Sequence, residues 1–144
     1  GLLWKQGLAS VSILKAEVDE RGASVILRSP IEFATNSAVL GQEARDFLNK
    51  MGAVFFNLPD TVVSIHCLCR TSGGDDDDLL MASERAAAIA RYLQDTCQVP
   101  GGRIDALGFS HTRYLGSLVE ENPEQAVLLS MRRIHETGRG RAKR

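Results

Sequence analysis

Hydrophobic positions in the first half of the chain follow two different periods. Residues 11–18 alternate loosely and residues 23–28 form a β-rich run, with a turn ending in Gly22 between them. Residues 44–58 instead repeat apolar side chains at three- and four-residue steps, which is typical of a helix with one buried face. The pattern therefore predicts a β-hairpin followed by an amphipathic helix.

The second half repeats the alternation of strand and helix. Residues 61–69 are β-branched and bounded by turn residues, and an alanine-rich helix follows from about Leu79 to Thr96. Two further strand-like runs cover residues 103–109 and 126–136. Because helices that connect strands favour parallel pairing, we expect a mixed β-sheet with two main helices on one face, a two-layer α/β (α+β) sandwich. The last two strands are free to pair antiparallel.

Length and charge narrow the possible functions. The chain has 144 residues, which suits one domain, and a net charge of −1, which gives no field attracting nucleic acid or an anionic membrane. We expect a core domain over residues 18–136, a lead-in with a strand over 1–17, and a basic flexible tail over 137–144.

Candidate catalytic and metal-binding residues are few. Cys67 and Cys69 lie two apart in a predicted strand and share a face, but two thiolates without further ligands make a poor metal site. We interpret them as small buried thiols. No serine or cysteine nucleophile can be matched to His66 as a partner base. We therefore expect no enzymatic activity, no cofactor and no metal site.

A glycine loop between the third strand and the second long helix carries the remaining charged residues. Arg70 and Arg85 flank this loop and could border one pocket. The four aspartates at 75–78 precede the helix, where the positive helix end stabilises carboxylates, and they lack the ligand spacing of a calcium loop.

Several short motifs occur in a characteristic order. They are Phe33 with Asn36-Ser37-Ala38 and Leu40, Arg85-Ala86 after Met81, Arg103-Ile104 through Gly108-Phe109, and Arg132-Arg133-Ile134. In this order they resemble the C-terminal domain shared by OmpA, Pal and the flagellar stator protein MotB, over roughly residues 18–136, and the stretch from Val18 to Phe33 is most similar to the MotB branch.

The resemblance implies a non-catalytic domain that binds the peptide stem of peptidoglycan. In the family an arginine holds the carboxylate of the diaminopimelate zwitterion and an aspartate holds its ammonium group. The arginine corresponds to Arg85, whereas Arg70 occupies the aspartate position. The family threonine, serine and asparagine positions correspond to Cys69, Ala82 and Met131, and an acid such as Asp78 is a candidate substitute for the missing aspartate.

Two functions follow from the resemblance. The first is anchoring of an envelope or flagellar-stator-like protein to the cell wall by non-covalent association with peptidoglycan. The second is a degenerate domain that has lost wall binding and acts in protein–protein assembly, through envelope protein partners or a homodimer. Both imply a periplasmic location, with a membrane tether before Gly1, and no nucleic acid partner.

Overall fold

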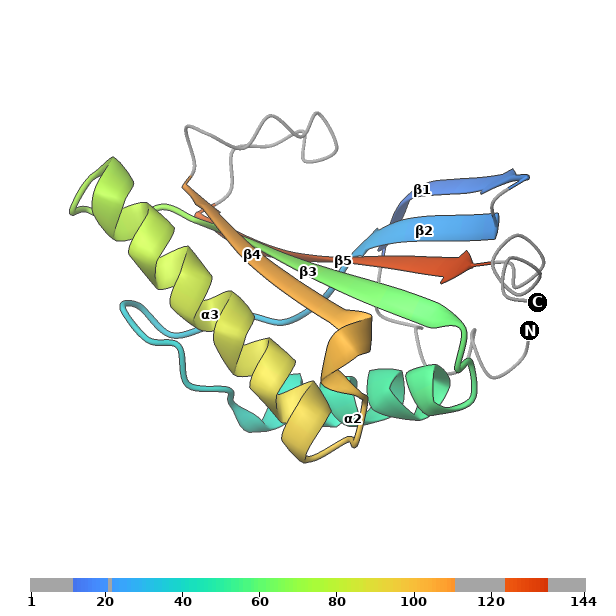
Figure 1. The fold of residues 1–144 in the computed structure, drawn as a ribbon. Coiled ribbons are helices and arrows are strands. Elements are labelled where there is room, and N and C mark those ends of the chain that lie inside the picture. The colour runs from blue at the N-terminus through green and yellow to red at the C-terminus, as the bar shows by residue number, and fades with distance from the viewer. Residues whose placement is uncertain (1–11, 21, 111–123, 135–144) are drawn as a thin grey trace.

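A five-stranded sheet with two helices on one face makes up the fold (Figure 1). The computed structural model describes residues 12–20, 22–110 and 124–134, and the statements below concern these residues. The elements are β1 (Ser12–Asp19), β2 (Gly22–Arg28), α2 (Gln42–Phe56), β3 (Thr61–Cys69), α3 (Asp75–Asp95), the 3₁₀ turn η1 (Gly101–Arg103), β4 (Ile104–Ser110) and β5 (Gln125–Ile134).

The strands lie in the order β1-β2-β5-β3-β4. β3 and β4, joined through α3, pair in parallel, and the other neighbouring strands pair antiparallel. The two-layer sandwich with a mixed sheet predicted from the sequence is confirmed. The suggested pairing of the last two strands is wrong, because β5 enters the middle of the sheet between β2 and β3 rather than joining β4.

Element boundaries agree with the hydrophobic pattern except at one helix start. The hairpin, α2 and β3 lie where the pattern predicts them, but α3 begins at Asp75 rather than near Leu79. The four aspartates therefore form its first turn, where the helix N-terminus stabilises negative charge. Most of the predicted lead-in, all of the predicted basic tail and most of the loop between β4 and β5 lie outside the described residues.

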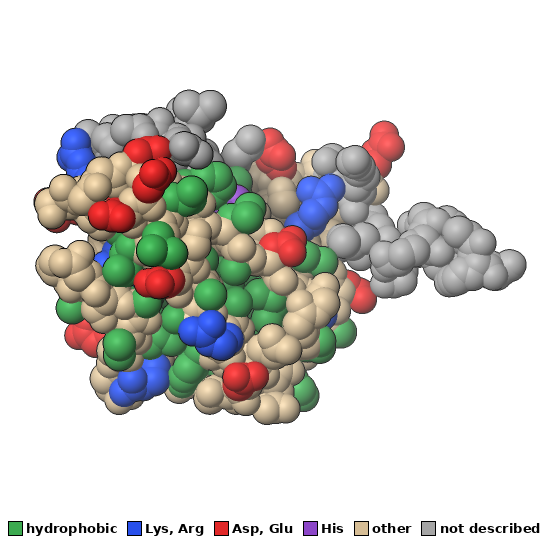
Figure 2. Space-filling model, turned by 60° about the vertical axis from the view of Figure 1, so that its left-hand side comes forward, with side chains coloured by type: hydrophobic (Ala, Val, Ile, Leu, Met, Phe, Trp, Pro, Cys, Tyr) green, Lys and Arg blue, Asp and Glu red, His purple; other side chains and the backbone are tan. Residues whose placement is uncertain are grey.

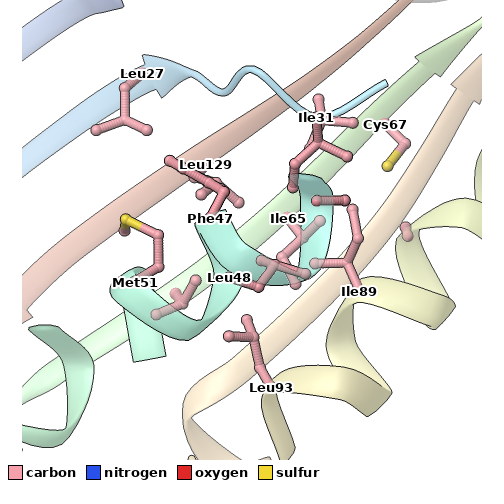
Figure 3. Close-up of a cluster of buried hydrophobic side chains, with 14 of the residues drawn as sticks. Leu27, Ile31, Phe47, Leu48, Met51, Ile65, Cys67, Ile89, Leu93 and Leu129 are labelled. Atoms are coloured by element: carbon pink, nitrogen blue, oxygen red, sulfur yellow. The ribbon is translucent and has the colours of Figure 1, made fainter. Parts of the chain in front are cut away.

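The core fills the space between the sheet and the two helices (Figure 3). Its side chains come from both layers and include the fully buried Leu27, Leu48, Ile65, Ile89 and Leu129. Cys67 and Cys69 belong to the same cluster, as expected for buried thiols. Burial of these apolar groups is the main force that holds the helices against the sheet.

The helix α3 approaches β4 unusually closely. A Cβ atom placed on Gly108 would lie 2.5 Å from the carbonyl carbon of Ala82, and even nearer to the backbone nitrogen of Ser83. Small residues on both elements permit this contact, and it sets the height of α3 above the sheet.

The described surface is mixed in character. Figure 2 shows acidic and basic side chains scattered among hydrophobic and other groups on the face in view. Within the described ranges, no helix combines the length and apolar character that a membrane crossing requires.

Candidate functional site

The candidate site lies where β3 ends and β5 begins, beside the segment that leads from β2 to α2. Gln125, the first residue of β5, pairs with Cys69, the last residue of β3. Its side-chain amide holds the passing segment: Phe33 N–H donates to Gln125 Oε1 at 2.8 Å, and Gln125 Nε2 donates to the Phe33 carbonyl at 3.0 Å. These bonds fix residues 31–40 against the end of the sheet.

Arg85 reaches this segment from the middle of α3 and is only 4% exposed. Its Nε donates to the Ser37 carbonyl at 2.8 Å and its Nη2 to the Ala34 carbonyl at 3.1 Å. Its Nη1 contacts Cys69 Sγ at 3.3 Å, and the guanidinium lies 4.9 Å from the centre of the Phe33 ring. The arginine thus ties together the helix, the strand end and the incoming segment.

These bonds leave part of the Arg85 guanidinium unused. A guanidinium has five N–H donors, and the three hydrogen bonds take one each from Nε, Nη1 and Nη2. Among the described residues, one N–H on each terminal nitrogen therefore has no partner. A pair of such donors is the set that binds the two oxygens of a carboxylate.

A polar cavity of about 420 Å³ opens over this guanidinium. Both Arg70 and Arg85 line it, as do Thr35, Asn36, Cys69, Thr71, Ser72, Glu124 and Gln125. The two arginines differ in setting, because Arg85 is buried and Arg70 is exposed. The Arg70 backbone N–H donates to the Glu124 carbonyl at 2.9 Å, which extends the pairing of β3 with β5 by one residue.

Asp78 does not line this cavity but supports the loop beside it. It is 5% exposed, and its Oδ1 accepts hydrogen bonds from Thr71 N–H at 2.5 Å and Thr71 Oγ1 at 2.7 Å. Thr71 Oγ1 in turn accepts from Gly73 N–H at 3.1 Å. The Asp78 carboxylate is therefore engaged in holding the glycine loop in place.

The two thiols near the site are held in the neutral form. Burial raises the pKa of Cys67 to about 12, an effect that the nearby positive charge of Arg85 partly opposes. Burial also raises the pKa of Cys69, with Arg85 again opposing. Cys69 therefore meets a ligand as a neutral thiol.

Two of the residues suggested by the resemblance lie away from the cavity. Ala82 is fully buried where α3 packs on Gly108 and does not line the cavity. Met131 lies six residues after Gln125 in β5, about 20 Å away at the usual rise of a strand, and lines a different, mainly apolar cavity with Val25. The structure thus brings together Arg70, Cys69 and Arg85, with Asp78 behind the loop.

Several cavity residues were not anticipated from the sequence. Thr35, Asn36, Glu124 and Gln125 come from segments far from the glycine loop in sequence. Asn36 adopts a left-handed backbone conformation with φ of 56°, which asparagine tolerates better than most residues. Glu124 and Gln125 reach the cavity only because β5 lies next to β3, which no local pattern reveals.

Comparisons with known proteins agree on the fold. A MotB-like protein from Desulfovibrio vulgaris aligns with a TM-score of 0.63 and 18% identity, over 85% of this chain and 80% of its own. The cell wall anchor of the T6SS from Pseudomonas aeruginosa aligns with a TM-score of 0.62 and 19% identity, over 92% of this chain and 94% of its own. The peptidoglycan-associated lipoprotein from Burkholderia pseudomallei aligns with a TM-score of 0.57 and 17% identity, over 69% of this chain and 87% of its own.

Sequence comparison identifies the family directly. A comparison with curated protein sequences finds no match. The model of the OmpA family, however, matches residues 32–133, a range that contains every described residue lining the cavity. The chain therefore belongs to the OmpA family.

Proposed function

We propose that this domain is a non-catalytic module of the bacterial envelope that associates with the peptide stem of peptidoglycan. The observation that carries the proposal is Arg85, a buried arginine that lines a polar cavity and that, within the described ranges, keeps one free N–H on each terminal nitrogen. It is the arginine that the family resemblance assigns to the ligand carboxylate. Names of structurally similar proteins, such as the cell wall anchor and the peptidoglycan-associated lipoprotein, support the same assignment.

The geometry favours carboxylate binding because the guanidinium is held rigidly before the ligand arrives. Three hydrogen bonds and the Phe33 ring fix its plane, so little side-chain entropy remains to be lost on binding. Burial also keeps water away from the charge and strengthens a bidentate contact. A domain with this site anchors its parent protein by holding one end of the stem peptide, and a periplasmic location follows from the position of that ligand.

Co-sedimentation with purified peptidoglycan sacculi tests the proposal. We expect the wild-type domain to pellet with sacculi and Arg85→Lys to pellet much less, because lysine keeps the charge but loses the planar fork. Arg91→Lys on the exposed side of the same helix is the matched control and should pellet like the wild type. Thermal unfolding of both variants separates lost binding from lost folding.

The second candidate function is assembly with envelope proteins or with a second copy after loss of wall binding. It is favoured by Arg70, which places a positive charge at the cavity where the family keeps an aspartate. Failure of the wild type to pellet, combined with pelleting of Arg70→Asp, would support this second function. Sedimentation velocity of the wild type would then show whether the domain forms dimers.

A further inference from the structure

The structure places an acidic residue opposite Arg70, just beyond the paired ends of β3 and β5. The last residue pair of β3 and β5 is Cys69 with Gln125, and the hydrogen bond from Arg70 N–H to the Glu124 carbonyl continues this register by one residue. Residues opposite each other in an antiparallel pair have Cβ atoms about 4.5–5.5 Å apart. Glu124, one residue before β5, therefore lies beside Arg70, the position at which the family carries its aspartate.

Glu124 also lines the same cavity as Arg85. It is exposed at the rim, whereas Arg85 is buried beneath. Within the described part of the chain, the Glu124 carboxylate forms no hydrogen bond or ion pair. Among the described residues, one cavity is thus lined both by a carboxylate without a partner and by a guanidinium that keeps N–H groups without partners.

We propose that Glu124 binds the ligand's ammonium group and so replaces the family aspartate from the neighbouring strand. This inference rests on the proposed function and adds one residue to its site, for a ligand in which one carbon carries both an ammonium group and a carboxylate. Arg85 takes the carboxylate and Glu124 takes the ammonium. The positive charge of Arg70 repels the same ammonium group and so weakens its binding to the Glu124 carboxylate.

Other acids near the loop fit this role less well. The Asp78 carboxylate is buried and occupied by Thr71. Asp77 borders an adjoining cavity on the far side of Thr71 and Ser72, not the one that Arg85 lines. Of the described acidic residues, Glu124 alone lines the cavity with Arg85.

Calorimetric titration with two probes tests the inference. The first probe is a synthetic stem tripeptide ending in meso-diaminopimelate, and the second is the same peptide with its side-chain amine acetylated. We expect Glu124→Gln to weaken binding of the first probe at least about tenfold, and to leave the already weaker binding of the second probe unchanged. Glu32→Gln, an exposed glutamate outside the cavity, is the matched control and should bind both probes like the wild type.

A charge exchange gives an independent readout. Arg70→Asp alone should tighten binding of the first probe, and Arg70→Asp combined with Glu124→Gln should restore at least wild-type affinity. If Glu124→Gln binds the first probe as tightly as the wild type while Arg85→Lys loses binding, Glu124 has no role but the proposed function stands. If the wild type binds neither the first probe nor sacculi, the proposed function and this inference both fail.

Discussion

The side-chain amide of Gln125 forms hydrogen bonds with both the backbone N–H and the backbone carbonyl of Phe33, at 2.8 and 3.0 Å. The two residues lie 92 positions apart in sequence. The bonds imitate a strand pairing, although Phe33 lies in no strand. They position the segment that supplies the carbonyl partners of Arg85. The shape of the cavity therefore depends on a side chain of β5 that does not itself carry charge.

Replacing Gln125 by leucine should destabilise the domain by about 1–3 kcal/mol, because a part-buried N–H and carbonyl of Phe33 lose their partners. Urea unfolding followed by circular dichroism measures the change. Gln94→Leu, on the exposed surface of α3, is the control and should change stability by about 0.5 kcal/mol or less. Equal effects of the two substitutions would contradict the role given to Gln125.

Gly108→Ala should destabilise the fold by about 3 kcal/mol, because the new methyl group would overlap the backbone of α3 at Ala82. The helix must move away from β4 to relieve this overlap. Gly102→Ala provides the control, since a Cβ there meets no atom within 4 Å. A Gly108→Ala variant with wild-type thermal stability would show that α3 does not pack as closely as described.

Asp78→Ala should destabilise the domain by about 1–3 kcal/mol, because Thr71 loses the acceptor for its N–H and its hydroxyl. Asp78→Asn keeps one acceptor oxygen and should therefore destabilise the domain less than Asp78→Ala. Asp76→Ala, exposed in the same helical turn, should cost about 1 kcal/mol or less from the weakened helix-end interaction. Urea midpoints of the three variants decide whether Asp78 acts through Thr71 or only through its charge.

His66 should make the domain less stable as the solution becomes acidic. Burial lowers the pKa of His66 below its ordinary value of 6.5, and the negative charge of Asp105 partly opposes this. The unfolded chain therefore binds a proton more readily than the folded one, so stability is complete above pH 6.5 and falls as pH drops through the folded pKa. The imidazole packs edge-on against Phe109 with ring centres 5.4 Å apart.

Thermal unfolding between pH 5 and pH 8 measures this dependence. His66→Gln should remove the part of the stability loss at acidic pH that protonation of His66 causes. Asp105→Asn should steepen the loss, because the folded imidazolium then has less negative charge nearby. Parallel pH profiles for the wild type and His66→Gln would mean that His66 titrates alike in both states.

The periodicity of hydrophobic residues was enough to predict the strands, the helices and the two-layer arrangement. Strand and helix periods are local properties, so β3 and the inward stripe of α3 could be predicted before any tertiary structure was known. The order of short motifs was likewise enough to indicate the family and to single out Arg85.

Only the tertiary structure decided what surrounds that arginine. The place of β5 between β2 and β3 sets Glu124 beside Arg70 and Gln125 beside Phe33, and both contacts join segments far apart in sequence. The same register carries Met131 to the other end of the sheet. Strand order depends on which apolar faces pack together across the whole core, and a local sequence pattern holds no information about that choice.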